Sequence, residues 1–110
     1  MSHPIIAHVS QLDATGDLGT TLPDGRTIFM VRVHGRISAF ENRCPHQGVD
    51  LDGGTDTFLE GGRELIQCSR HGALFLPENG ECVFGPCQGR MLTSLPISID
   101  GAGNIRLSSQ

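Results

Sequence analysis

Two short motifs could together hold a metal centre. The first is C-P-H at residues 44–46, and the second, after a gap of 21 residues, is C-S-R-H at residues 68–71. Each motif places one thiolate and one imidazole within a turn of backbone, so the pair offers two sulfur and two nitrogen ligands. This donor set favours zinc or an iron–sulfur centre, because thiolates and imidazoles together suit few other metals. The candidate ligands are Cys44, His46, Cys68 and His71.

The order of the ligands distinguishes the two kinds of centre. Zinc fingers usually group two cysteines in one motif and two histidines in the other, whereas each motif here contains one of each. A mixed order suits a cluster of two iron atoms with unlike ligands. A zinc-binding structural module remains the alternative on residue types alone.

The motifs and their surroundings resemble the Rieske [2Fe–2S] family. Glycine closes both motifs, giving C-P-H-Q-G at residues 44–48 and C-S-R-H-G at residues 68–72. The segment 80–86 resembles the family's third, proline-bearing loop, and the segment 95–101 resembles its closing hairpin. The resemblance covers most of the chain from about residue 28 onward.

This resemblance implies one Rieske-type [2Fe–2S] cluster, in which Cys44 and Cys68 bind one iron and His46 and His71 bind the other. It also implies the Rieske fold, which is all-β, with a small antiparallel sandwich or barrel as its base and a cluster-binding subdomain. We expect a single domain over residues 1–110, with the cluster-binding part at about residues 41–87.

Composition and patterning also predict an all-β protein. Fifteen glycines and six prolines in 110 residues indicate many tight turns and few long helices. A hairpin is predicted over residues 27–40 with its turn at His34-Gly35, and a final hairpin over residues 94–100 and 104–107. Further strands are predicted at residues 5–9, 64–67 and 73–76, and residues 55–62 are expected to form an exposed loop tip away from the ligands.

Charge and hydropathy exclude several classes of function. The formal net charge is −4 and no basic stretch is present, which argues against nucleic-acid binding. No run approaches the roughly 18 apolar residues of a membrane span, and the N-terminus lacks the features of a signal peptide. We therefore expect a cytoplasmic protein with no membrane association.

The resemblance implies an electron carrier and not an enzyme, since the chain has no room for a second domain with a catalytic iron site. Its partners would be a flavoprotein reductase and a terminal oxygenase or dioxygenase. The alternative is a small Rieske subunit of a larger reductase, such as nitrite reductase. High-potential family members carry a disulfide between the cluster loops and hydroxyl donors to sulfur, and the matching positions here lack them. We expect a potential toward the low end of the family range of roughly −150 to +300 mV.

Other reactive residues carry weaker expectations. Cys82 and Cys87 are expected to be buried thiols that pack as small apolar groups. Gln47 and Arg70 flank the histidine ligands and are candidates for contact with a partner. The remaining histidines, His3, His8 and His34, are expected to be ordinary surface residues.

Overall fold

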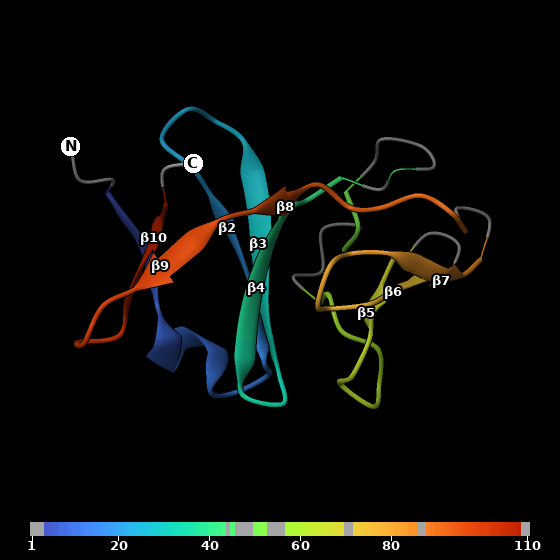
Figure 1. Cartoon of the computed structure of the whole chain (residues 1–110), viewed down its shortest axis with the longest axis horizontal. Helices are drawn as coiled ribbons and strands as arrows, with labels where there is room; N and C mark the ends of the chain where they lie inside the picture. Colours follow the sequence, from blue (N-terminus) through green and yellow to red (C-terminus); the bar gives the residue numbers. More distant parts are fainter. Residues whose placement is uncertain are drawn as a thin grey trace.

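The computed structural model describes residues 4–43, 45, 50–52, 57–69, 72–85 and 88–108, and within them almost all regular structure is β (Figure 1). The elements in chain order are β1 (Ile5–His8), the 3₁₀ helix η1 (Val9–Leu12), β2 (Asp17–Thr21), β3 (Thr27–Val33), β4 (Arg36–Glu41), β5 (Ile66–Gln67), β6 (Leu74–Phe75), β7 (Cys82–Phe84), β8 (Ser94–Leu95), β9 (Ile97–Ile99) and β10 (Asn104–Leu107). No helix in these residues is long and apolar enough to cross a membrane.

The strands form three antiparallel sheets. The central sheet has the order β2-β3-β4-β8, a second has the order β1-β10-β9, and a third has the order β5-β6-β7. Figure 1 shows β9 and β10 on one side of the central sheet and β5–β7 on the other. The prediction of an all-β fold is confirmed.

Strand β3 contributes side chains to two hydrophobic cores, one on each face of the central sheet. Phe29 and Val31 point to one face of the central sheet and pack in the core that also contains Ile66 of β5 and Phe75 of β6. Met30 points to the other face and packs in a second core with residues of η1 and β10. A strand covered on both faces needs apolar side chains at successive positions, which is the pattern of residues 28–31.

The hairpin predicted over residues 27–40 is confirmed, with β4 extending to Glu41. His34 and Gly35 form its two-residue turn, with φ values of 53° and 78°. Left-handed backbone at both positions is what a two-residue hairpin turn requires, because it matches the twist of the flanking strands. His34 therefore occupies the turn as expected.

The predicted final hairpin is wrong in one respect. Residues 94–100 were expected to form one strand, but Pro96 divides it into β8, which pairs with β4, and β9, which pairs with β10. Proline has no N–H to donate to a ladder, so pairing stops there and the chain crosses from one sheet to another. Strand β2 was not predicted, since Asp and Gly in D-L-G-T-T are depleted in strands; the strand is established by its pairing with β3.

The segment 55–62 is only partly the exposed tip that the sequence suggested. Phe58 is fully buried and stacks on Phe29, with ring centroids 4.5 Å apart, and Leu59 pairs with Ile66 in an isolated bridge. Residues 55 and 56 lie outside the described residues; in the rest of the segment Thr57 is exposed, and an exposed turn begins after Glu60, where the N–H of Arg63 donates to the carbonyl of Glu60. The apolar pair at 58–59 was the sequence signal for core residues in this segment.

Candidate metal centre

One of the four candidate ligands, Cys68, lies among the described residues. Cys44, His46 and His71 lie outside them, as do Gln47 and Arg70, the two candidates for partner contact. Within the motifs the structure therefore describes Pro45, Cys68 and Ser69. We call these residues, together with the segments that flank the motifs, the frame.

Cys68 follows β5 and is completely buried in the core that contains Phe75. Its backbone N–H donates to the carbonyl of Ala73 at 2.9 Å, and its carbonyl accepts from the N–H of Gly72 at 3.0 Å. Gly72 has φ = 68°, which suits glycine. These bonds tie the backbone on the two sides of the second motif together.

Asn42 closes the segment that contains the first motif. It follows β4, and its side-chain Oδ1 accepts a hydrogen bond from the N–H of Leu51 at 2.8 Å. Its Nδ2 donates to Oδ1 of the buried Asp52 at 3.3 Å, and its own N–H donates to the carbonyl of Thr27. The side chain thus joins the two ends of residues 43–50 and fixes both to β3.

Two hydrogen bonds connect the motifs to other segments. The N–H of Ser69, next to Cys68, donates to the carbonyl of Leu51 at 2.7 Å. Nη1 of Arg90 donates to the carbonyl of Pro45, the residue between the first pair of candidate ligands, at 2.9 Å. The first bond joins Ser69 to the segment that follows the first motif, and the second joins Pro45 to the segment after β7.

The predicted third loop begins as a strand. Residues 82–84 form β7 and pair with β6, and only then does the chain reach Gly85. This glycine has φ = 104°, and a Cβ there would lie 2.8 Å from Cα of Ala73. Glycine at 85 therefore allows the segment after β7 to pack directly on the backbone that follows the second motif.

Cys82 is buried, as predicted, and its thiol donates to the carbonyl of Phe84 at 3.3 Å. Cys87 lies outside the described residues. The side chain of Phe84 points outward from the same strand and is 61% exposed, and Val83 beside it is also exposed.

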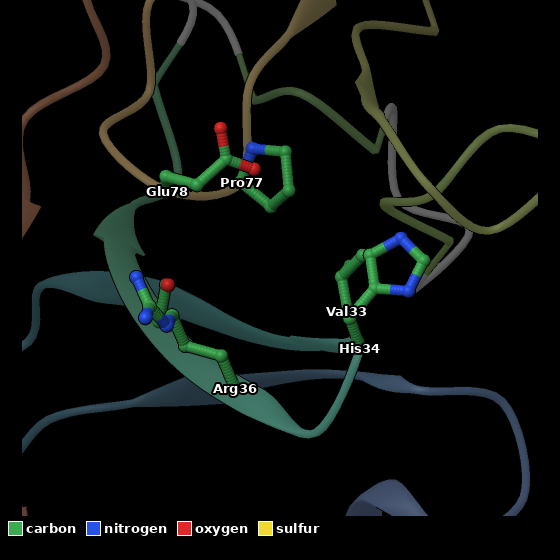
Figure 2. A pocket seen from close by; sticks show the side chains of 6 residues that line it. Val33, His34, Arg36, Pro77 and Glu78 are labelled. Carbon is green, nitrogen blue, oxygen red and sulfur yellow. The ribbon is translucent and has the colours of Figure 1, made fainter.

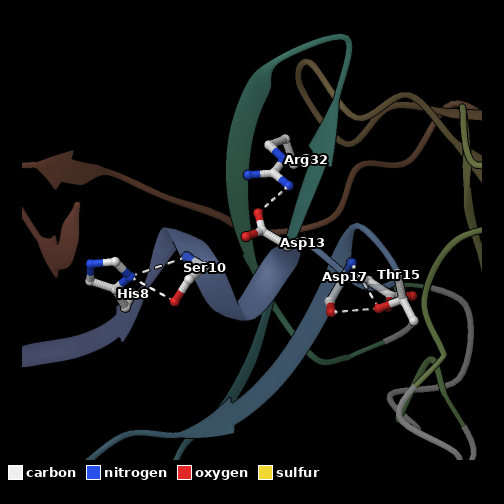
Figure 3. Close-up of polar contacts among 6 residues, drawn as sticks. All are labelled: His8, Ser10, Asp13, Thr15, Asp17 and Arg32. Carbon is white, nitrogen blue, oxygen red and sulfur yellow. Dashed lines mark hydrogen bonds and ion pairs between the residues drawn. The ribbon is translucent and has the colours of Figure 1, made fainter.

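Asp17 is a supporting residue that the sequence did not reveal. It is buried in β2, and Oδ2 accepts from the N–H groups of Phe58 at 2.9 Å and Leu59 at 3.3 Å. The Thr15 hydroxyl donates to Oδ1 at 2.6 Å (Figure 3). The carbonyl of Phe58 accepts a hydrogen bond from the N–H of Gln67 in β5, the strand that precedes Cys68. The Asp17 carboxylate therefore anchors the segment to which β5 is hydrogen-bonded.

His8 is not the ordinary surface residue that the sequence suggested. Its Nδ1 accepts from the N–H of Ser10 at 3.1 Å and caps η1 (Figure 3), while Nε2 donates to the carbonyl of Ala102 at 2.7 Å. The imidazole therefore ties η1 to the turn between β9 and β10. Both ring nitrogens have structural partners.

His34 lines a surface pocket of about 320 Å³. Figure 2 shows it with Arg36 on the β3–β4 hairpin, facing Glu78 and Pro77 of the turn after β6. His34 Nε2 lies 3.2 Å from Oε1 of Glu64, and both side chains are well exposed. Among the described residues, those that line this pocket belong to the β3–β4 hairpin and the turn after β6, and Cys68 is not one of them.

The described frame fits a [2Fe–2S] cluster held between two loops. The thiol of Cys68, the one candidate ligand among the described residues, is shielded from water, and hydrogen bonds restrain the backbone at Ser69 and Pro45. Two cysteines and two histidines at these motifs are the donor set of a Rieske centre.

Comparison with known proteins agrees with this frame. The family model described as Rieske [2Fe-2S] domain matches residues 2–97. The solved ferredoxin of carbazole 1,9a-dioxygenase from Nocardioides aromaticivorans IC177 has a TM-score of 0.77 at 22% identity, and the match covers 100% of both chains. A chain from the complex of reduced oxygenase and oxidized ferredoxin in carbazole 1,9a-dioxygenase has a TM-score of 0.74 at 19% identity, covering 96% of this chain and 100% of that chain.

A curated relative matches a shorter region. Oxidoreductase NdmD of Pseudomonas putida is 42% identical to this chain over 52 residues, which are 47% of this chain and 8% of that protein. The chain therefore corresponds to a small part of that relative's length.

Proposed function

Because the chain belongs to the Rieske [2Fe–2S] domain family, we propose that it is a one-electron carrier, a ferredoxin that passes electrons from a flavoprotein reductase to a terminal oxygenase. The observation that carries this proposal is the match, over the full length of both chains, to a ferredoxin of a dioxygenase. An electron carrier needs a cluster near a surface but no substrate cavity of its own.

The proposed ligands are Cys44 and Cys68 for one iron and His46 and His71 for the other. A Rieske cluster supplies reversible uptake of one electron at a potential raised by its two neutral imidazole ligands. The chain would contribute the buried Cys68 thiol and the hydrogen bonds of Asn42 and Ser69 that hold the motifs. The missing disulfide and hydroxyl donors support a potential at the low end of the family range.

The exposed Phe84 supports a docking surface for the oxygenase beside the ligand loops. The cross-strand partner of Phe84 is Leu74, and the neighbouring Gly85 packs on Ala73, two residues after His71. Aromatic side chains are enriched at interfaces, and Val83 beside Phe84 is also exposed. Electron transfer requires close approach to the cluster, so an apolar contact at this position would serve it.

A second candidate is a Rieske module of a larger reductase, of which the nitrite reductase small subunit is one form. The identity of 42% with part of Oxidoreductase NdmD favours it. In that case the electron donor and this module would belong to one assembly. A zinc-binding structural module is disfavoured by the family match.

The test combines spectroscopy with reconstitution. The purified protein should be red-brown, and its dithionite-reduced form should give the rhombic EPR signal of a mixed Cys/His cluster. It should also restore turnover to a ferredoxin-dependent oxygenase supplied with NADH and a flavoprotein reductase. A colourless protein containing stoichiometric zinc would refute the carrier. A cluster-containing protein that exchanges electrons only within a co-purifying reductase would favour the second candidate.

His71→Ala tests the ligand set within the same experiment. We expect this variant to lose the cluster, whereas His34→Asn should keep the wild-type spectrum, since Asn tolerates the left-handed turn at that position. A native EPR signal in His71→Ala would remove His71 from the ligands.

A further inference from the structure

Arg90 connects two segments that are far apart in the sequence. Its backbone carbonyl accepts a hydrogen bond from the N–H of Cys82 in β7 at 2.9 Å, and its side-chain Nη1 donates to the carbonyl of Pro45 at 2.9 Å. The neighbouring Met91 pairs with Glu81 in a bridge. The backbone of Arg90 is therefore held on β7 while its guanidinium reaches the first ligand motif.

The acceptor at Pro45 is well placed to fix this motif. Proline has no N–H, so its carbonyl is the one backbone group through which residue 45 can be held by hydrogen bonds. Residue 45 lies between Cys44 and His46, which means that an anchor at its carbonyl restrains the backbone of both. The guanidinium is planar and presents several donors in a fixed geometry, which suits such an anchor.

Arg90 is exposed, and its hydrogen bond to Pro45 does not neutralise its charge. Arg26, Arg32 and Arg106 form ion pairs with aspartates, whereas Arg90 donates to a neutral carbonyl and, among the described residues, forms no ion pair. A cation at this position favours the cluster state that carries one more negative charge.

We propose that Arg90 is a positioning residue that holds the first ligand loop and raises the reduction potential of the cluster. This inference rests on the proposed Rieske cluster. It assigns to Arg90 two separable effects, retention of the cluster through the bond to Pro45 and a shift of the potential through its positive charge.

Three variants test the proposal without any redox partner. Arg90→Met removes donor and charge while keeping an apolar chain, Arg90→Lys keeps the charge and one donor group, and Arg26→Met is the matched control at an arginine paired with Asp24 in the β2–β3 turn. The measurements are the rate of cluster bleaching by an iron chelator and the reduction potential from a redox titration followed by EPR.

We expect Arg90→Met to lose the cluster roughly tenfold faster than wild type, as is typical when support for a metal ligand is removed, and to have a lower potential. Arg90→Lys should recover most of the potential, and Arg26→Met should match wild type in both readouts. Wild-type bleaching and potential in Arg90→Met would overturn the proposal. Lower thermal stability with an unchanged potential would also overturn it, because that pattern belongs to a purely structural side chain.

Failure of the proposed function is distinguishable from failure of this inference. A wild-type protein without an iron–sulfur spectrum would refute the proposed function before any variant is compared. A wild-type protein with the expected spectrum, combined with unaltered Arg90 variants, would refute the role of Arg90 alone.

Discussion

The side-chain oxygen of Asn42 accepts a hydrogen bond from the backbone N–H of Leu51 at 2.8 Å. Residues 43–50, which include the first ligand motif, lie between the two residues that this bond joins. Leu51 is fully buried, so water cannot replace the acceptor if it is removed. The carbonyl of the same residue receives the N–H of Ser69, and Asn42 therefore supports both motifs.

Asn42→Ala should lower the free energy of unfolding by about 1–3 kcal/mol, because it leaves the buried N–H of Leu51 without its acceptor. Chelator-driven cluster loss should also become faster. Urea titration of the protein, followed by circular dichroism, measures the first effect. Asn79→Ala is the matched control, since Asn79 accepts from the N–H of Glu81 in an exposed turn. Equal losses in the two variants would contradict a special role for Asn42.

Asp17→Ala should destabilise the fold by about 2–4 kcal/mol, since two buried N–H groups, those of Phe58 and Leu59, lose one shared carboxylate acceptor. Asp13→Ala is the control, because the exposed pair of Asp13 with Arg32 (Figure 3) contributes about 0–1 kcal/mol. Thermal and urea unfolding give both values. If Asp13→Ala proved as damaging as Asp17→Ala, the anchoring role of Asp17 would be wrong.

Comparison of Gly85→Ala with Gly89→Ala distinguishes the stability lost through a left-handed alanine backbone from the stability lost through a steric clash. Both glycines are left-handed, with φ values of 104° and 88°, but a Cβ at 85 meets Ala73 at 2.8 Å whereas a Cβ at 89 meets no atom within 4 Å. Each alanine should cost about 1–2 kcal/mol through its backbone conformation, and Gly85→Ala should cost more and also disturb the cluster spectrum. The comparison requires unfolding curves and visible circular dichroism. Identical behaviour of the two variants would show that the close approach at Ala73 has no consequence.

Phe84→Ala should weaken association with the terminal oxygenase without changing the cluster. We expect roughly a tenfold rise in the ferredoxin concentration needed for half-maximal turnover, a common effect of removing a central interface aromatic, and an unchanged EPR spectrum. Ile99→Ala is the control, since Ile99 is also exposed but lies on β9 across the central sheet. An unaltered concentration dependence in Phe84→Ala would place the docking surface elsewhere.

Glu60 should contribute to the acid sensitivity of the fold. Backbone N–H groups of Glu64, Gly62 and Leu65 donate to its carboxylate and lower its pKa from the ordinary 4.5. Because the folded pKa is the lower one, the stabilisation is present above the unfolded value and is lost as the pH falls through the folded value. Urea unfolding over a pH series should therefore show a smaller loss below pH 4.5 in Glu60→Gln than in wild type. The charge-matched variant Glu78→Gln controls for the removal of one carboxylate, and a Glu60→Gln profile parallel to wild type would contradict the assignment.

Local sequence patterns were sufficient for the hairpin over residues 27–40, because its β-branched and apolar residues and its turn residues all act within a few positions. They also located both ligand motifs. The supports of those motifs could not be predicted in this way. Asp17 contacts backbone groups 41 and 42 positions away, and Arg90 reaches a carbonyl 45 positions away, so neither partner is visible until the sheets are assembled.

The same limit explains the errors. Pro96 was visible in the sequence, but the change of sheet at that point depends on which strands lie on either side of it. His8 has two partners, one nearby in η1 and one at Ala102, and only the first is within reach of a local pattern. Phe58 was treated as part of a loop because its buried partner, Phe29, belongs to a strand predicted separately.

The pairing of the first strand with the last has a consequence for how this unit can be joined to other polypeptides. Ile5 of β1 lies opposite Arg106 of β10, so both ends of the described chain leave the same sheet. Figure 1 shows this sheet on the opposite side of the central sheet from β5–β7. A linker or an appended domain at either end would therefore start on the side away from the ligand motifs. The same fold can thus stand alone or form one segment of a longer protein without added chain starting on the side of β5–β7.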